Sequence, residues 1–498
     1  MFKLYTLTAI LIFKLCLVLL NDGFASPKTL ESTYITSDHP VDVLPLHDGP
    51  LSLLKRIELI RNAKDSIDLE YFIFNDDLAG EIIFKELVDA RNRGVKVRLL
   101  LDAFSIKGVI TPFHFHELKK RKIQVRYFND EVLARTIKVQ YRDHRKLFIV
   151  DNDYFIIGGR NIADEYFDLD ERYNFIDREV LVKGDIVTGV KKSFDLFWNS
   201  KLTNSPTRPE RPSFNALKYR IASGSERSRM IKVYRSAVRK WKQNVSSARQ
   251  VFKSSKEGKE VVGKLYDLEP KLKSLEKNYF KCNNPKVISD QPLAGPSHDS
   301  KRLLRNEIYY RLDSSKEKVL IDSPYFILTH DSDDLMMSVL KKGVEVKLLT
   351  NGIYSTDALP VASVFNYYLD EWLEAGLKPY VYGGKRTADT TYLLERVRNT
   401  RWGTHSKSIV FDEASVMVGT FNFDPRSAFY SAEISLFCDD SVDFANNVRS
   451  DIEQRMSNSI NFKTIEEAKK HEFDNVSLLK KMGYYLISPL SLMFQRLL

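Results

Sequence analysis

Cysteine is scarce in this sequence, and so are the residue spacings that would bind a metal ion. Only three of the 498 residues are Cys, and Cys16 lies in an apolar N-terminal stretch, which leaves Cys282 and Cys438. Two cysteines do not make a disulfide framework, and no Cys and His spacing resembles a zinc site. No acidic cluster suited to holding a metal is present either. We therefore expect no metal and no other cofactor.

Long apolar runs are limited to the two ends of the chain. Residues 4–20 are apolar, and Gly23 and Ala25 follow at the spacing of a signal-peptide cleavage site. Because Lys14 interrupts the run, an uncleaved membrane anchor or a buried helix is the alternative. Residues 478–498 are apolar, but this segment is too short and too interrupted to predict a membrane span. For this C-terminal segment, an interfacial position and a helix docked on the core are both open.

Acidic residues are outnumbered, and the excess of positive charge lies in one segment. The formal net charge is +10, and residues 218–277 contain 17 Lys or Arg against six Asp or Glu. Apolar residues recur at helical spacing in this segment, which predicts one or two amphipathic basic helices, with Pro270 ending or kinking one of them. The segment suits an anionic partner, either nucleic acid or a phospholipid surface, or it is a solvated connector.

The sequence does contain an 18-residue signature that occurs twice. It reads HRKLFIVDNDYFIIGGRN from His144 and HSKSIVFDEASVMVGTFN from His405. In each copy a Lys lies two residues after the His, an Asp five after the Lys, a Gly seven after the Asp and an Asn three after the Gly. The residues matched in this way are His144, Lys146, Asp151, Gly158 and Asn161 in the first copy, and His405, Lys407, Asp412, Gly419 and Asn422 in the second.

The sequence around the signature repeats as well. Residues 66–74 and 94–101 have strand patterns separated by a helical pattern, and residues 318–327 and 343–349 repeat both strands. We therefore expect an α/β fold made of two duplicated halves, each a mixed, mainly parallel sheet flanked by helices, forming one pseudo-twofold unit. The expected parts are a signal peptide or anchor (1–25), the first half (40–202), a basic helical insert with linkers (203–300), the second half (301–460) and an apolar or amphipathic C-terminal segment (461–498).

The repeated polar residues suit a phosphodiester. Residues two apart on a strand point to the same face, so each His would lie beside its Lys. One imidazole could attack phosphorus and form a phosphohistidine, while the other protonates the leaving alkoxide and later deprotonates the acceptor. Lysines and asparagines would stabilise charge on the phosphate oxygens. The predicted catalytic residues are His144, Lys146, Asn161, His405, Lys407 and Asn422.

Four carboxylates are predicted to support this chemistry. Asp151 lies in turn-forming sequence between two strands, so Asp151 and its counterpart Asp412 are expected to be structural. A reacting histidine needs an orienting carboxylate on its other ring nitrogen. Glu433 and Asp177 follow the two signatures on the next strands and are the candidates, with Glu179 competing with Asp177. Charges on an edge strand are the alternative interpretation of all three.

At these residues the sequence resembles the phospholipase D superfamily, whose mark is a duplicated HxKxxxxD followed by a glycine and an asparagine. Residues 158–167, 419–427 and 323–326 are similar to the bacterial cardiolipin synthases, in particular their C-type branch. Thr420, where Ser is commoner, and the long basic insert depart from the family's pattern.

The resemblance implies a phosphatidyl group that is held on one histidine and passed to an alcohol. It implies a membrane-associated phosphatidyltransferase, which acts on phosphatidylglycerol or other glycerophospholipids at the membrane surface. The N-terminal segment would place the protein in the bacterial cell envelope, either membrane-associated or exported to the periplasmic side. The nucleophile is assigned to His144 and the general acid/base to His405, although the two copies are symmetric. A phospholipase D hydrolase with water as acceptor is the nearest alternative. A nuclease is disfavoured by the apolar ends of the chain, and a non-catalytic lipid-binding scaffold by the two intact signatures.

Overall fold

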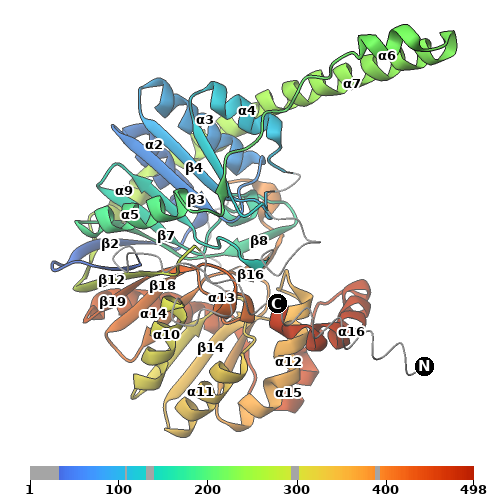
Figure 1. Ribbon diagram of the computed structural model, residues 1–498. Helices are drawn as coiled ribbons and strands as arrows, with labels where there is room; N and C mark the ends of the chain where they lie inside the picture. The colour runs from blue at the N-terminus through green and yellow to red at the C-terminus, as the bar shows by residue number, and fades with distance from the viewer. Residues whose placement is uncertain (1–32, 107–108, 131–139, 293–301, 387–392) are drawn as a thin grey trace, which may run out of the picture. The chain divides into compact units, whose positions relative to one another are not determined.

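The computed structural model describes residues 33–106, 109–130, 140–292, 302–386 and 393–498. The predicted signal peptide or anchor therefore lies outside the described residues. The described chain forms two nine-stranded sheets and a small two-stranded sheet, with helices between and around them (Figure 1).

The first sheet carries the first signature. Its strands lie in the order β10 (Thr203–Asn204), β5 (Gln124–Phe128), β4 (Lys96–Asp102), β3 (Ser66–Tyr71), β6 (Leu147–Val150), β7 (Tyr154–Gly158), β9 (Glu179–Lys183), β2 (Val41–Leu46) and β11 (Phe280–Cys282). Its helices are α2 (Gly49–Asn62), α3 (Leu78–Asn92), α4 (Pro112–Lys120) and α5 (Ile186–Trp198).

The second sheet repeats the arrangement around the second signature. Its strands lie in the order β1 (Tyr34–Thr36), β12 (Asn284–Ser289), β19 (Ile434–Asp439), β18 (Ser415–Gly419), β17 (Ser408–Phe411), β13 (Lys318–Asp322), β14 (Glu345–Asn351), β15 (Lys378–Tyr382) and β20 (Ser459–Asn461). Its helices are α10 (Leu303–Ser314), α11 (His330–Lys341), α12 (Leu359–Glu374) and α14 (Val442–Ser457).

These two orders confirm the α/β fold of two duplicated halves. The order β5–β4–β3–β6–β7–β9 in one sheet corresponds to β15–β14–β13–β17–β18–β19 in the other. Only the first three strands of each series are parallel to one another. Within each signature the two strands run antiparallel, because a short hairpin connects β6 to β7 and β17 to β18. β6 and β17 also run antiparallel to β3 and β13. Each sheet is therefore mixed, but it is not mainly parallel as the sequence led us to expect.

Strand alternation divides the apolar side chains between separate cores. In β6, Leu147 and Ile149 face a central core that also contains α5, α14 and the inner face of the second sheet. Phe148 and Val150 face the opposite way, toward α2 and α3. Residues two apart on a strand share a face, so a four-residue apolar strand serves both cores. The two sheets thus pack directly on each other through β7, β9, β18 and β19, and α5 and α14 complete the same core.

The halves also exchange their edge strands. β1 precedes the strands of the first half in sequence but pairs with β12 in the second sheet, whereas β11 precedes β12 but pairs with β2 in the first sheet. Both β11 and β12 lie inside the segment 203–300 that the sequence predicts as an insert with linkers.

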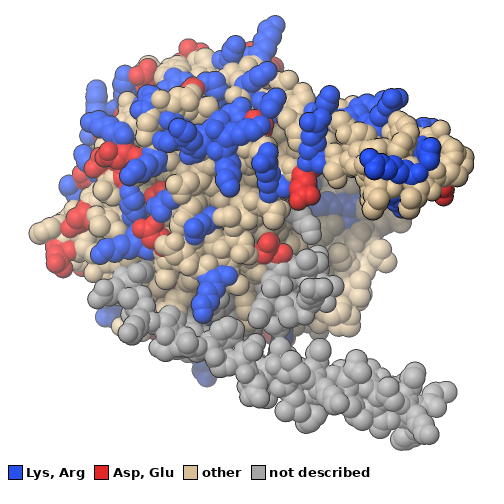
Figure 2. Space-filling view, turned by 45° about the horizontal axis from the view of Figure 1, so that its top comes forward, with Lys and Arg blue, Asp and Glu red and all other residues tan. Residues whose placement is uncertain are grey.

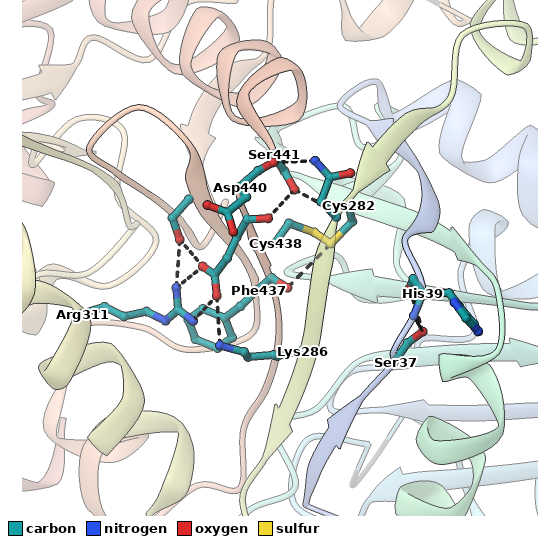
Figure 3. The surroundings of a disulfide bond; sticks show 12 residues. Ser37, His39, Cys282, Lys286, Arg311, Phe437, Cys438, Asp440 and Ser441 are labelled. Carbon is teal, nitrogen blue, oxygen red and sulfur yellow. Dashed lines mark hydrogen bonds and ion pairs between the residues drawn. A yellow bond between two sulfur atoms is a disulfide. The ribbon is translucent and has the colours of Figure 1, made fainter.

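A disulfide joins the two sheets next to this exchange (Figure 3). Cys282 lies on β11 of the first sheet and Cys438 on β19 of the second. This bond was not predictable from the cysteine spacing, because 156 positions separate the two residues. Only the antiparallel pairing of β12 with β19 brings Cys282, two residues before β12, beside Cys438.

The basic segment forms four helices, which are α6 (Ala216–Ile221), α7 (Gly224–Gln250), α8 (Lys256–Tyr266) and α9 (Glu269–Glu276). The end of α7 contacts α4 through Trp241 and Phe113, and the rest of α6 and α7 projects from the sheets as an arm that bears Lys and Arg side chains (Figures 1 and 2). α8 and α9 pack on the first half through Val261, Leu265 and Leu272. Pro270 lies in the first turn of α9, where its missing N–H costs nothing, so it starts a helix.

Two helices follow the second half, α15 (Ile465–His471) and α16 (Leu478–Met493). α16 packs on α12 through one side, with Tyr484 and Ser491 buried. Across the described residues, none of the helices is both long enough and apolar enough to span a membrane.

Candidate active site

Backbone pairing between the halves brings the two signatures together. The N–H of His144 donates to the carbonyl of Ala432, 3.0 Å away, at the start of β19. In the other half β16 (Arg401–Thr404) pairs in parallel with β8 (Tyr173–Ile176), and the N–H of His405 donates to the carbonyl of Ile176 at 2.8 Å. Each histidine therefore follows a segment that is bonded to the opposite half. The sequence predicts His144 and Lys146 on a strand, but β6 begins only at residue 147, because this cross-half contact precedes it.

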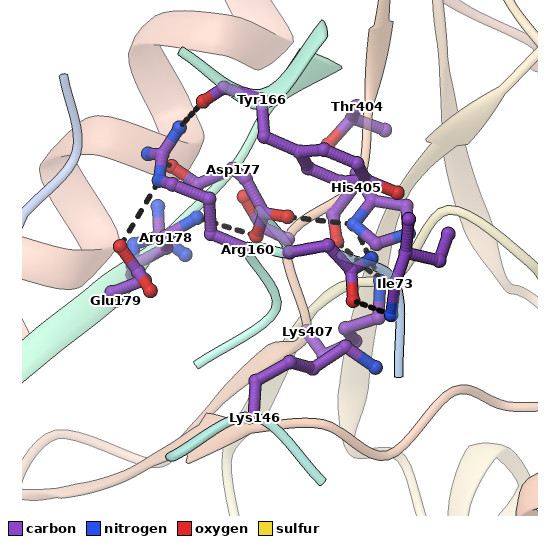
Figure 4. A network of polar contacts seen from close by, with 12 residues as sticks. Ile73, Lys146, Arg160, Tyr166, Asp177, Arg178, Glu179, Thr404, His405 and Lys407 are labelled. Atoms are coloured by element: carbon purple, nitrogen blue, oxygen red, sulfur yellow. Dashed lines mark hydrogen bonds and ion pairs between the residues drawn. The ribbon is translucent and has the colours of Figure 1, made fainter. Parts of the chain in front are cut away.

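Each imidazole is held by a carboxylate of the other half. Nδ1 of His144 lies 2.9 Å from Oε2 of Glu433. Nδ1 of His405 lies 2.6 Å from Oδ2 of Asp177, and Figure 4 shows this second pair. Both carboxylates are buried. An Nδ1–H donated to a carboxylate fixes the tautomer, which leaves a lone pair on Nε2 for chemistry. The structure thus places both predicted orienting carboxylates beside histidines, each paired across the halves.

Glu179, the competing candidate, does not face a histidine. Its carboxylate accepts hydrogen bonds from the buried side chains of Arg56, Arg160 and Ser52. It is part of a structural ion-pair network behind the site. Arg160 links this network to the site, since its Nη2 donates to the carbonyl of Asp177 at 2.8 Å (Figure 4).

The two lysines lie beside the histidines and are buried. Nζ of Lys146 donates to the carbonyl oxygen of His144 at 2.6 Å, and Nζ of Lys407 donates to that of His405. Burial lowers the pKa of Lys146 to about 7 and that of Lys407 to about 8, and the Lys407 ammonium also lowers the pKa of Lys146. Two cations held so close together form an electrostatic site for an anion.

Burial and these cations also act on the imidazoles. Burial, followed by Lys146 and Lys407, lowers the pKa of His144 well below its usual value. Burial, followed by the same lysines and His144 itself, does the same to the pKa of His405. These effects favour neutral imidazoles, which are the form that can attack phosphorus. A bound phosphodiester carries negative charge, so it would raise the pKa of both imidazoles and oppose the effect of the lysines.

Small residues in the signatures let the carboxylates approach. A Cβ on Gly159 would lie 2.3 Å from Oδ1 of Asp177, and a Cβ on Gly419 would lie 1.9 Å from Oγ of Ser435 on β19. Any side chain at either position would push the neighbouring strand away. The glycines therefore set the distance between each signature and the strand that supplies a carboxylate.

Thr420 supports one of the carboxylates directly. Its Oγ1 donates to Oε2 of Glu433 at 2.5 Å, and Oγ of Ser427 donates to Oε1 at 2.7 Å. With His144, both carboxylate oxygens are fully engaged. Burial nevertheless raises the pKa of Glu433 to about 7. In the sequence, Thr420 stands out only because Ser is commoner at this position in the family. Both residues have a hydroxyl group that can donate to Glu433, which explains why either one is suitable here.

The two asparagines differ in their contacts. Oδ1 of Asn161 accepts the N–H of Ile73 at 3.1 Å (Figure 4), which ties the first signature to the end of β3. Oδ1 of Asn422 is buried and has no hydrogen-bond partner among the described residues. The Oδ1 atom of Asn161 is therefore held by the protein, whereas that of Asn422 is not held by any described residue.

The two aspartates of the signatures lie at the far ends of their strands. The Asp151 carboxylate accepts the backbone N–H groups of residues 64–66, and the Asp412 carboxylate accepts those of residues 316–318. Both have positive φ, 54° and 49°. A short polar side chain at such a position suits a hairpin turn. Each aspartate binds the loop that begins the central strand of its sheet, which is a structural role.

Aromatic rings and a second polar group line the site. Phe72 contacts the ring of His144 edge-on, while Tyr166 and Phe175 contact that of His405. Asp357, in the loop after β14, accepts a hydrogen bond from the Tyr325 hydroxyl at 2.9 Å and acts electrostatically on Lys407. Residue spacing gave no signal for Asp357, because it lies outside the repeated signature.

Two His–Lys pairs in a duplicated α/β fold, with each histidine held by a carboxylate, define a phospholipase D-type site. The family described as "Cardiolipin synthase, PLD-like domain" matches residues 56–198 and 308–456. The protein belongs to this family and is a phospholipase D-type enzyme, as the signatures predicted.

Individual relatives agree with this assignment. The chain is 30% identical over 447 residues to an uncharacterized protein of Helicobacter pylori strain 26695, covering 85% of this chain and 80% of the relative. It is 27% identical over 414 residues to cardiolipin synthase C of Escherichia coli, covering 80% and 82%. Phosphatidylserine synthase of Haemophilus influenzae has a similar fold, with a TM-score of 0.60 at 15% identity over 93% of this chain and 98% of that one.

Proposed function

We propose that this protein is a membrane-associated phosphatidyltransferase, similar to cardiolipin synthase, that works through a covalent phosphohistidine. The observation that carries the proposal is the crossed pairing of the two imidazoles with Glu433 and Asp177, which orients both rings in one site. Relatives named cardiolipin synthase and phosphatidylserine synthase support a phospholipid as substrate. In this proposal the histidines and the carboxylates act on the phosphodiester of the substrate, a group that all phospholipids of this kind contain.

In the first step Nε2 of His144 attacks phosphorus, and the bond to the leaving alcohol breaks. The imidazolium of His405 donates its Nε2 proton to the leaving oxygen, and Asp177 stabilises the charge of that imidazolium. The negative phosphodiester raises the pKa of His405 when it binds, which supplies the required proton. Lys146, Lys407, Asn161 and Asn422 stabilise the charge on the other phosphate oxygens.

In the second step an acceptor hydroxyl attacks the phosphohistidine. Neutral His405 takes the proton of the hydroxyl, the new P–O bond forms, and the P–N bond to His144 breaks. If the acceptor is the headgroup of a second phosphatidylglycerol, the product is cardiolipin; if it is water, the product is phosphatidic acid. Asp357 and Tyr325 supply a hydrogen-bonding rim on which an alcohol acceptor can be oriented.

We also propose that the protein works at a bacterial membrane outside the cytoplasm. The disulfide between Cys282 and Cys438 supports an oxidising compartment. The basic arm and the exposed apolar side of α16 support a lipid surface as the anionic partner in preference to nucleic acid.

The test is a product analysis with purified full-length protein and phosphatidylglycerol dispersed in detergent. We expect cardiolipin and free glycerol, detected by mass spectrometry, and phosphatidic acid alone would identify a hydrolase instead. His144→Ala and His405→Ala should each lower the rate by about 10³-fold or more. His330→Ala is the matched control, because this histidine lies on α11 with 85% of its side chain exposed. Retention of the full rate by either signature variant would exclude the two-histidine mechanism.

A further inference from the structure

α16 has an exposed apolar side that the fold does not cover. Seven large apolar side chains on α16, and that of Phe494 directly after it, are exposed, with Leu479 at 81% and Leu486 at 80%. Their spacing of three and four residues places most of them on one stripe of the helix. This outer face of α16 consists of Leu478, Leu479, Met482, Tyr485, Leu486, Leu490, Met493 and Phe494.

The opposite side of α16 is fixed to the protein. Tyr484 is buried, and its hydroxyl donates to Glu472 at 2.8 Å. Nζ of Lys480 donates to the carbonyls of Tyr354 and Thr356 at 3.1 and 2.9 Å. The helix therefore has a defined orientation, and its outer face points away from the core. Burying even a few of these side chains would contribute a large hydrophobic free energy.

The charges of α16 suit an anionic lipid surface. The helix contains no Asp or Glu, and because Lys480 is bonded inward to the carbonyls of Tyr354 and Thr356, Lys481 is its other basic residue. An amphipathic helix that combines an apolar face, basic residues and a tyrosine lies in the plane of a membrane interface. Its 16 residues are too few to cross a bilayer.

α16 and the residues that follow it are bonded to two segments near the active site. The carbonyls that accept Lys480 belong to the loop that carries Asp357, the residue hydrogen-bonded to Tyr325. Beyond α16, the carbonyl of Leu497 accepts a hydrogen bond from Arg426, which acts electrostatically on His144. A bilayer that met the outer face of α16 would therefore lie beside the site.

We infer that the outer face of α16 is the membrane-docking surface of this protein, and that it holds the active-site rim at the level of anionic phospholipid headgroups. The inference rests on the proposed function, since it assumes that the substrates are phospholipids of a bilayer. The occupant of the face is the bilayer itself. The alternative occupant of this face is a second copy of the chain, and the test below distinguishes the two.

The test places a fluorescent probe in the outer face. Leu486→Trp in the full-length protein is mixed with vesicles of phosphatidylglycerol and phosphatidylcholine whose acyl chains are brominated. The protein has four native tryptophans, so the signal is the difference from the unsubstituted protein under the same conditions. We expect this added emission to shift to the blue and to be quenched by the bromines. Tyr310→Trp is the matched control, because Tyr310 is 69% exposed on α10, and its emission should not change. Quenching is local, so attachment of the protein through another segment does not produce it.

A second variant measures the contribution of the face to binding. Leu479→Asp with Leu486→Asp should lower the vesicle partition coefficient by about 100-fold, whereas Tyr310→Asp should not. Unquenched Leu486→Trp on bound protein would overturn the inference. So would a blue-shifted emission without vesicles that depends on protein concentration, because it would show a dimer interface. Neither measurement needs turnover, so a failure of phosphatidyl transfer would count against the proposed function alone.

Discussion

Nδ1 of His144 lies 2.9 Å from a carboxylate oxygen of Glu433, a residue 289 positions further along the chain. The reciprocal pair, His405 with Asp177, spans 228 positions in the opposite direction. Neither half of the duplicated fold therefore holds a complete set of reacting groups. The halves are joined at the site by the backbone bonds that precede each histidine, so the chemistry and the packing of the two halves depend on the same contacts.

Removing either orienting charge should slow the reaction without preventing folding. Glu433→Gln and Asp177→Asn keep the size of the side chain but lose the carboxylate that stabilises an imidazolium or fixes its tautomer. We expect kcat to fall by about 10²- to 10⁴-fold in each variant, with KM changed much less. The double variant should lose far less than the product of the two effects, because the histidines act as a unit. Effects that multiply would show that the two histidines act independently.

Thr420 should act as a positioning residue through its hydroxyl. Thr420→Ala removes one of the donors that hold Glu433, and we expect kcat to fall by about tenfold. Thr420→Ser keeps the donor and should stay close to the starting rate. The conservative variant thus separates the hydroxyl from the packing of the methyl group. Equal rates for the Ala and Ser variants would contradict the role.

The sequence predicted the site better than it predicted the connections between the halves. The spacing of His144, Lys146 and Asn161, and its repeat, was sufficient to predict residues that the structure brings together in one site, because the proposed chemistry constrains those residue types locally. The pairing of each histidine with a carboxylate of the other half was not predictable, since it depends on which strand ends meet in space. The exchange of β1 and β11 between sheets and the disulfide beside it were missed for the same reason.

The raised pKa of Glu433 predicts an acid limb in the pH–rate profile. Its pKa of about 7 in the folded protein means that the carboxylate gains a proton as the pH falls through 7. The protonated group holds His144 less well, so kcat/KM should fall on the acid side of about pH 7. In Glu433→Gln the acid limb should be absent, and kcat/KM should be low without falling further below pH 7. An acid limb unchanged in that variant would assign it to another group.

A basic limb should follow from the lysines. The pKa values of about 7 for Lys146 and about 8 for Lys407 mean that both ammonium groups lose their charge as the pH rises through this range. Neutral amines bind a phosphodiester less well, so KM should rise above about pH 8 while kcat changes less. Lys407→Arg should move the rise in KM to higher pH, because a guanidinium keeps its charge. A KM independent of pH would contradict the clamp.

An activated substrate can decide which histidine is the nucleophile. Phosphatidyl-p-nitrophenol has a leaving group that needs no protonation, so His405→Ala should still release about one equivalent of nitrophenol per protein in a burst. Turnover should then stop, because no base activates the acceptor. His144→Ala should show no burst, and mass spectrometry should find the phosphatidyl group on His144 of the first variant. A burst in His144→Ala instead would reverse the two roles.

The disulfide should stabilise the contact between the sheets on which the crossed site depends. It closes a loop of about 156 residues, and opening it should lower the free energy of unfolding by about 2–4 kcal/mol. Urea unfolding of the oxidised and the reduced protein measures this difference directly. Cys282→Ser with Cys438→Ser should match the reduced protein and should not respond to reductant, which controls for effects on Cys16. Because Cys282 joins the exchanged strand β11 to the second sheet, we also expect reduction to loosen β11, seen as faster amide exchange at residues 280–282. Identical unfolding curves with and without reductant would mean that the strand pairing alone holds the two sheets together.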